Sequence, residues 1–301
     1  MEATHPKIRK RLLRWIMVLL SVLLLLTGVN FFLQSIWAHQ FTPFYPEGEP
    51  IDLYPIITQQ KMGPEDYDLV FKQTGLAQTA VDDLRQMGEE GLQFILNAQK
   101  TVFTPLESEC VTLIFGRFTC EDLLRNKDGT PAYGPQIAPL RPGDVIVSFS
   151  THSWGWRHGH AGLVVDSAHQ ASLEAVQLGV NTYVADMNHW RNYSNFMVLR
   201  VKDSTEVQRK QVTDFAIEYL NDVPYSLLSG VFGAKDQGGA EEIKTQCAYL
   251  PWRAWQEAGV DLDGDGGRIV TVQDLVESDD LEVVQVYGID PELLIDRQSR
   301  N

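Results

Sequence analysis

The sequence is poor in cysteine, with three in 301 residues, and poor in basic residues, with 25 lysines and arginines against 40 aspartates and glutamates. So few cysteines exclude a small scaffold held together by disulfides. The formal net charge of −15 argues against nucleic acid or anionic lipid headgroups as partners. Glycine and proline contents are ordinary, and the chain has no internal repeat or low-complexity tract, which excludes a disordered stalk.

One long run without charge extends from Trp15 to Leu33. A membrane-spanning helix needs about 20 predominantly apolar residues, so this run predicts a membrane anchor. The segment after it lacks basic residues as far as Phe41, whereas five precede it: Lys7, Arg9, Lys10, Arg11 and Arg14. This asymmetry predicts a cytoplasmic N-terminus and an extracytoplasmic folded region, in a single-pass membrane protein. A signal peptide cleaved near Ala38 stays open as the alternative, although secretory apolar cores usually run only about 7–15 residues.

Composition and periodicity divide the chain into successive regions. Apolar residues fall at helical spacing from Gly63 to about Gln99, with interruptions at Gly75 and Gly88, and the pattern changes to short β-rich runs after Pro142. The predicted regions are a basic flank and transmembrane anchor (1–37), an extended linker (38–60), a helical accessory region (61–139), an α+β domain (140–290) and a tail (291–301).

The α+β domain is predicted from its strand and helix signals. Helices are expected from Thr205, where Thr205 and Gln208 fit a capping box, and across the segment from Cys247 to Ala258. Strands are expected at 145–149, 161–165, 173–176, 196–201 and 281–287. The fold class is therefore α+β, with helices packed on an antiparallel sheet.

Two of the cysteines form a candidate disulfide. Cys110 and Cys120 flank a strand–turn–strand pattern that could bring them within bridging distance. A disulfide between them is expected because the predicted compartment is oxidising. Cys247 is then the odd one out. A lone cysteine is often only a small buried hydrophobe, so its surroundings must decide its role.

Three of the seven histidines lie between Thr151 and His160, directly before an apolar strand. His160 begins that strand, where rigid backbone suits a general base, and His158 would face the same side if the strand began that early. Ordinary loop histidines and a zinc cluster are the competing interpretations. Zinc is disfavoured because no His/Cys pair in the sequence has suitable ligand spacing.

The segment around Cys247 favours a reactive thiol. If Thr245 caps a helix, Cys247 lies in its first turn, where free N–H groups and the helix dipole favour the thiolate. The sequence alone does not establish that His160 and Cys247 meet in space.

Five fragments occur in an order that resembles a known family: Arg141–Ile146, Gly159–Val165, Leu173–Ala175, Pro224–Tyr225 and Gln246–Trp252. They are similar to the motifs of circularly permuted papain-fold cysteine hydrolases, most of all the YiiX-like branch of the NlpC-type cysteine peptidase superfamily. The resemblance covers about residues 140–288. It implies a permuted papain-like sheet with Cys247 as nucleophile, His160 as base and Glu174 as the group that orients the imidazole; a solvent-facing strand residue is the alternative for Glu174.

The sequence departs from the family after the nucleophile, because Pro251 stands where a proline is not usual. A proline inside a helix kinks it, which leaves the oxyanion geometry open. The backbone N–H of Cys247 is the expected oxyanion donor, and the side-chain candidates for oxyanion or substrate contacts are Tyr225, Gln246 and His158.

The resemblance implies a cysteine hydrolase that cleaves an amide or ester through a thioester and requires no cofactor. Candidate substrates are peptides, cell-wall amides and lipid-like esters. Two alternatives stay open: a non-catalytic binding or scaffold module on the same fold, and a lipid-directed thiol acyltransferase.

A calcium loop is a further candidate. Asp261, Asp263 and Asp265 copy the opening of such a loop, but its twelfth position is Val272 rather than a bidentate glutamate. An acidic surface turn is the alternative.

Overall fold

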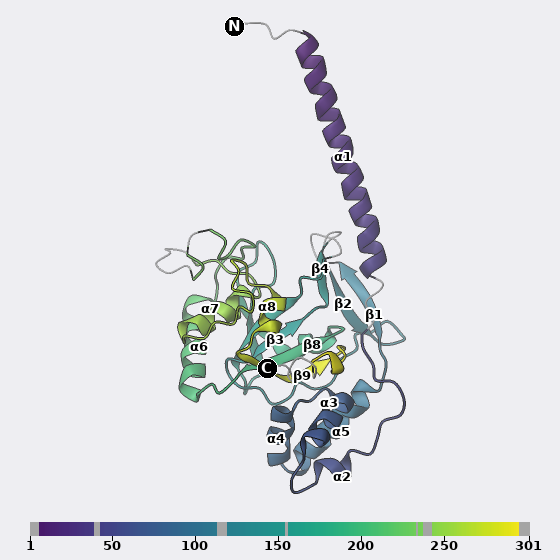
Figure 1. Ribbon diagram of the computed structural model, residues 1–301, viewed down its shortest axis with the longest axis vertical. Coiled ribbons are helices and arrows are strands. Elements are labelled where there is room, and N and C mark those ends of the chain that lie inside the picture. The colour runs from purple at the N-terminus through teal and green to yellow at the C-terminus, as the bar shows by residue number, and fades with distance from the viewer. Residues whose placement is uncertain are drawn as a thin grey trace.

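Helices and strands together build most of the chain in the computed structural model (Figure 1), which describes residues 6–38, 43–112, 119–153, 156–232, 234–236 and 243–294. The helices are α1 (Pro6–Ala38), α2 (Tyr54–Ile57), α3 (Pro64–Thr74), α4 (Gln78–Gln86), α5 (Glu89–Val102), the 3₁₀ helix η1 (Met187–Asn192), α6 (Glu206–Tyr219), α7 (Tyr249–Glu257) and α8 (Val272–Glu277). The strands are β1 (Glu107–Thr112), β2 (Thr119–Arg125), β3 (Val145–Ser148), β4 (Thr151–Ser153), β5 (His160–Asp166), β6 (Ala171–Glu174), β7 (Tyr183–Asp186), β8 (Phe196–Val201) and β9 (Leu281–Tyr287).

Helix α1 extends away from the rest of the protein (Figure 1). Its segment Arg9–Asn30 is long and apolar enough to cross a membrane, and none of that segment is buried against the folded part. Exposing an apolar helix of this length to water costs free energy, because the transfer of apolar surface from water to an apolar environment is favourable. A membrane provides such an environment for a helix of this length. The predicted apolar helix is therefore present, whereas its orientation in a membrane stays a prediction.

The strands form two antiparallel sheets, which confirms the α+β class. The larger sheet has the order β7-β6-β5-β3-β8-β9, and the smaller has the order β1-β2-β4. The sequence predicted the hairpin of β1 and β2 but not β4, which is only three residues long and joins the hairpin by pairing with β2. So short a strand carries too little alternation to be seen in the sequence.

Both faces of the larger sheet are covered by helices, because alternate strand residues point to opposite sides. Val145, Val147 and Leu163 belong to the core shared with α6 and α7. Ile146 and Val164 belong to the core shared with α3, α4 and α5. The accessory helices thus brace the sheet that carries the site described below, and Figure 1 shows them below the sheet, with α6 and α7 to its left.

The helix boundaries follow the predicted signals. Gly75 ends α3 with a φ of +72°, and a Cβ there would lie 2.0 Å from the Val286 carbonyl oxygen, so only glycine fits this close approach. The side chains of Thr205 and Gln208 form the predicted capping box of α6. Helix α2, strand β7, η1 and α8 were not predicted. Helix α2 lies in the segment 38–60 that was expected to be extended, and β1 and β2 lie in the region 61–139 that was expected to be helical.

Candidate active site

His160 is the first residue of β5, as the sequence predicted, and is held there by the backbone before it. Gly159 has a φ of +73°, and a Cβ on it would lie 2.6 Å from the Ser148 carbonyl oxygen. The strand does not reach back to His158, so that residue lies in the preceding loop. There its Nε2 lies 2.9 Å from Ser153 Oγ.

Glu174 lies beside His160, because it stands opposite Gly162 in the pairing of β5 with β6. The Nε2 atom of His160 donates to Glu174 Oε2 over 2.8 Å, and the two residues are 5% and 1% exposed. The other carboxylate oxygen accepts hydrogen bonds from Ser172 Oγ at 2.5 Å and from Trp190 Nε1 at 3.1 Å. Glu174 is therefore a buried residue in a fixed orientation, not a solvent-facing strand residue.

Helix η1 supplies two further residues that sequence reasoning did not place in this site. The Trp190 ring stacks on His160, with ring centroids 5.0 Å apart and an interplanar angle of 8°. The Nε2 atom of His189 lies 3.4 Å from Glu174 Oε2. A 3₁₀ helix of six residues has no hydrophobic periodicity long enough to predict, which is why both positions were missed.

The charges of the site support one another. Burial by itself lowers the pKa of His160, but hydrogen bonds with Cys247 and Glu174 outweigh it and raise that pKa to about 10. Burial works against ionisation of Glu174 as well, yet its hydrogen bonds with His160 and His189 hold its pKa well below the ordinary value. The site therefore favours a carboxylate facing an imidazolium.

Cys247 lies in a turn directly before α7, not within the first turn of a helix capped by Thr245. The N-cap of α7 is Ala248, and its first helical residue is Tyr249. Pro251 falls in the first turn of α7, where backbone N–H groups have no partner inside the helix, so it does not cause the kink that the sequence suggested.

Cys247 is 9% exposed, and its thiol lies close enough to His160 to raise the pKa of the imidazole. The Cys247 sulfur donates its own hydrogen bond to Gln246 Oε1 over 3.5 Å. Because Glu174 occupies Nε2 of His160, Nδ1 is the ring nitrogen that stays available to the thiol or to a substrate. A cavity of about 170 Å³ is lined by Cys247, His160, His158 and Tyr225, among others. The fold thus joins two residues that are far apart in the sequence at one accessible point.

Gln246 and Tyr225 differ in how free they are to act on a substrate. The Gln246 amide nitrogen donates to the Val270 carbonyl oxygen over 2.6 Å, and its Oε1 accepts from the backbone N–H of Ala248 at 2.9 Å. This side chain therefore supports the turn around the thiol. Burial raises the pKa of Tyr225, so its hydroxyl stays protonated and can donate a hydrogen bond into the cavity.

Comparison with known proteins gives little beyond this geometry. No family model matches the chain, and no curated protein matches it. Among solved structures the chain is similar to the metalloprotein YiiX from Escherichia coli O157:H7, with a TM-score of 0.38 and 15% sequence identity. The match covers 48% of this chain and 97% of that chain. A similarity this weak supports no inference, so the function depends on the site itself.

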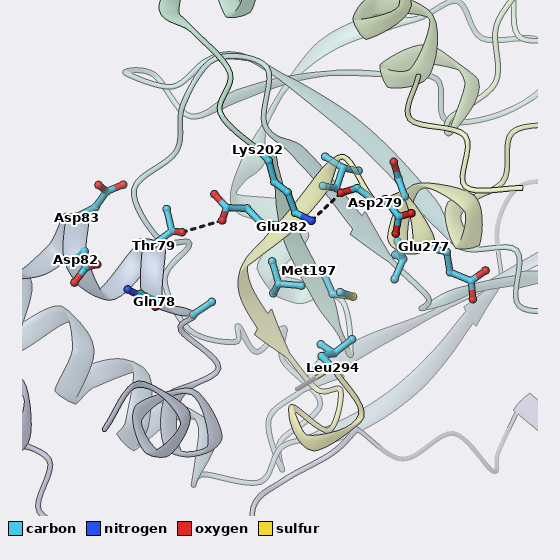
Figure 2. A pocket seen from close by; sticks show the side chains of 15 residues that line it. Gln78, Thr79, Asp82, Asp83, Met197, Lys202, Glu277, Asp279, Glu282 and Leu294 are labelled. Carbon is cyan, nitrogen blue, oxygen red and sulfur yellow. Dashed lines mark hydrogen bonds between the residues drawn. The ribbon is translucent and has the colours of Figure 1, made fainter. Parts of the chain in front are cut away.

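A larger cavity, of about 890 Å³, lies elsewhere, between α4 and β9 (Figure 2). Figure 2 shows Thr79 bonded to Glu282 and Lys202 bonded to Asp279 along its wall. Its lining residues include several carboxylates but no histidine or cysteine. The cavity at Cys247 is smaller, but it holds a nucleophile, a base and a polar donor, which is the combination that chemistry requires.

Cys110 and Cys120 are both free thiols in the structure, so the predicted disulfide is not formed there. In the pairing of β1 with β2, Cys110 stands opposite Asp122, and Cys120 stands opposite Thr112. The two cysteines are therefore diagonal neighbours, whose Cα atoms are about 7–8 Å apart, too far for a bridge without movement of the backbone.

The acidic loop after α7 differs from the predicted calcium set. Asp263, Asp265 and Asp274 place carboxylate oxygens within 4.8 Å of one another, whereas Asp261 instead accepts a hydrogen bond from Trp252 Nε1 at 2.7 Å. The ammonium group of Lys235 pairs with Asp263. A side-chain cation thus lies where a calcium ion would bind, and calcium binding stays a prediction.

Proposed function

We propose that this protein is a membrane-anchored extracytoplasmic cysteine hydrolase in which Cys247, His160 and Glu174 act as nucleophile, base and orienting carboxylate. One observation carries the proposal: the imidazole that Glu174 holds through Nε2 also interacts with the Cys247 thiol across the same small cavity. This is the nucleophile–base–orienter arrangement of covalent catalysis. Its position at a cavity gives a substrate access to the thiol.

The charges define the resting state. The raised pKa of His160 keeps its imidazole protonated at neutral pH, which places a positive ring beside Cys247. Glu174 stabilises the imidazolium and fixes its ring through the Nε2 bond. Trp190 holds the ring from one face by stacking.

The reaction follows from these positions. The Cys247 sulfur attacks a carbonyl carbon, and the tetrahedral oxyanion accepts hydrogen bonds from the backbone N–H of Cys247 and the Tyr225 hydroxyl. Collapse breaks the bond to the amine or alcohol, which leaves with the proton from His160 Nδ1. His160 then accepts a proton from water as the water attacks the thioester. Collapse of this second tetrahedral intermediate breaks the carbon–sulfur bond, releases the acid and restores the Cys247 thiolate beside the protonated imidazole.

The cavity wall favours a substrate with an apolar group beside the scissile bond. Leu178 and Leu227 line the cavity and are 48% and 57% exposed. Burial of such side chains against a substrate contributes about 25 cal/mol per Å² of apolar surface. We therefore expect acyl groups or peptide side chains of apolar character to be preferred over charged ones.

The test is the rate at which iodoacetamide alkylates Cys247 in the full chain in detergent, followed by mass spectrometry so that Cys247 is distinguished from the other two cysteines. We expect fast alkylation at pH values well below about 8.5, the ordinary pKa of a cysteine thiol. His160→Ala should slow it at least about tenfold at neutral pH, because the imidazolium is lost. The same protein is then assayed for hydrolysis of apolar acyl esters and peptide amides, with Cys247→Ala as the inactive control.

Two results would contradict the hydrolase. One is a Cys247 thiol that reacts only after denaturant is added. The other is an alkylation rate that His160→Ala slows no more than His169→Ala does. His169 is the control because it is an exposed histidine outside the site. Either would favour the non-catalytic binding module.

A further inference from the structure

Four metal-binding side chains gather on one face of the small sheet, away from Cys247. In the pairing of β1 with β2, Cys110 stands opposite Asp122, and in the pairing of β2 with β4, Cys120 stands opposite His152. Cys120 and Asp122 are two residues apart on β2, so they point to the same face. The three strands therefore bring two thiols, an imidazole and a carboxylate together.

Three of the four side chains lie close enough to approach one metal ion, and the fourth, Asp122, lies beside the imidazole. The sulfur atoms of Cys110 and Cys120 and a ring nitrogen of His152 lie within 4.8 Å of one another. His152 Nε2 is 4.0 Å from Cys110 Sγ and 3.4 Å from Asp122 Oδ1. In a tetrahedral zinc site with bond lengths of about 2.0–2.3 Å, neighbouring ligand atoms are roughly 3.3–3.8 Å apart. The two thiols and the imidazole must therefore draw slightly closer together, and the Asp122 carboxylate must turn toward them.

We propose that Cys110, Cys120, His152 and Asp122 bind a structural zinc ion. Two thiolates and an imidazole are the ligands that zinc prefers, and a carboxylate oxygen is an accepted fourth. His152, Asp122 and Cys120 are 1%, 2% and 7% exposed and Cys110 is half-buried, so three of the four ligands are shielded from solvent, as in structural zinc sites.

The charges around the cluster suit the metal. Binding releases the protons of both thiols, and Nε2 of His152 gives up the proton that it shares with Asp122. Two thiolates and one carboxylate around a divalent ion leave one negative charge in excess. Arg157 compensates for it, because its Nη1 lies 2.7 Å from Asp122 Oδ2, which leaves Oδ1 for the metal.

The metal would fix the wall of the candidate active site. Thr119, Glu121, Thr151 and Ser153 alternate with the ligand residues on β2 and β4, point to the opposite face of the small sheet and line the cavity at Cys247. Strand β1 contributes Cys110 from the outer edge of this sheet. One ion would thus tie all three strands together behind the cavity.

The experiment measures zinc bound to the full chain, purified in detergent under reducing conditions without chelators. We expect about one zinc per chain by elemental analysis. Cobalt(II) added to the zinc-free protein should give a thiolate-to-metal charge-transfer band and the visible bands of a tetrahedral ion. Cys110→Ser and Cys120→Ser should each weaken zinc binding by about tenfold or more and lower the charge-transfer intensity.

Cys247→Ser is the matched control, since it removes the third thiol without touching the cluster, and it should leave zinc content and the cobalt spectrum unchanged. Circular dichroism of each variant separates loss of a ligand from loss of the fold. The proposal is overturned if wild-type protein binds no more zinc than Cys110→Ser. It is also overturned if protein isolated without reductant has the intact mass of a Cys110–Cys120 disulfide and takes up no zinc after reduction.

Discussion

Gly162 stands directly opposite Glu174 in the pairing of β5 with β6. A Cβ added at Gly162 would lie 3.2 Å from Glu174 Cγ and 3.0 Å from Trp190 Cζ2. The missing side chain therefore gives the carboxylate room to reach His160 and the indole room to stack on it. Position 162 needs a glycine because a Cβ would crowd these neighbouring side chains. Backbone conformation is not the reason, because the φ of Gly162 is not in the left-handed region.

Gly162→Ala should displace Glu174 and Trp190 from His160. We expect the free energy of unfolding to fall by about 1–3 kcal/mol, as for other overpacked sites, and alkylation of Cys247 to slow. Denaturant unfolding followed by tryptophan fluorescence measures the first effect, and mass spectrometry measures the second. Gly63→Ala is the control, because the nearest atom to its added Cβ is 3.8 Å away. Equal results for the two variants would show that Gly162 is not needed for spacing.

Glu174→Gln keeps the shape of the side chain but removes its charge. Loss of an opposite charge at this distance should lower the pKa of His160 by about 1 to 3, because the imidazolium is no longer stabilised. Titration of the His160 ring by NMR measures the shift. Asp166→Asn removes an exposed carboxylate that contacts only His169 among the described side chains, and should leave His160 unaffected. An unchanged His160 titration in Glu174→Gln would exclude the orienting role.

The raised pKa of His160 makes stability depend on pH. The folded pKa is about 10 against an ordinary value of 6.5, so the protonated ring contributes stability that is fully present below 6.5 and is lost as the pH rises to about 10. We expect the free energy of unfolding to fall across that window in the wild type and to fall less in His160→Gln. Denaturant titrations of both proteins at several pH values measure the difference. Parallel curves for the two proteins would contradict the buried imidazolium.

Asp144 should contribute to stability rather than to catalysis. Its carboxylate accepts two hydrogen bonds from Arg200, at 2.9 and 2.8 Å, and the residues are 1% and 2% exposed. Asp144→Asn leaves the buried guanidinium of Arg200 with less negative charge around it, so it should lower the free energy of unfolding by about 3–5 kcal/mol. Asp214→Asn, which breaks the exposed pair with Lys210, should cost at most about 1 kcal/mol. A small loss in Asp144→Asn would show that Asp83, which also contacts Arg200, is sufficient.

Helix α1 should anchor the protein with its N-terminus in the cytoplasm. We expect the full chain to stay in the membrane fraction after alkaline extraction, and its folded domain to be digested by protease added outside the cytoplasmic membrane. Replacing the five basic residues before the helix with asparagine should lower the fraction of chains in that orientation, because basic flanking residues determine it. These residues are Lys7, Arg9, Lys10, Arg11 and Arg14. A mature protein that begins after Ala38 would show instead that the segment is a cleaved signal peptide.

The local elements were predictable because their signals are local. The apolar run of α1, the glycine breaks at Gly75 and Gly88, and the capping box at Thr205 all act within a few residues, and the structure places the helices accordingly. The predictions failed where neighbours far along the chain decide. Thr245 pairs with Tyr225 rather than capping α7, and the register of β1 and β2 places Cys110 opposite Asp122 rather than Cys120.

The sequence by itself determined the class of the fold, the apolar helix and the residue types that chemistry requires, because periodicity, hydropathy and side-chain chemistry are properties of the chain. Only the tertiary structure decided which of these residues meet. Strand register places Glu174 against His160, and η1 adds His189 and Trp190. The pairing of β2 with β4 brings His152 to two cysteines more than thirty residues earlier, since spacing along a chain does not limit which strands lie side by side.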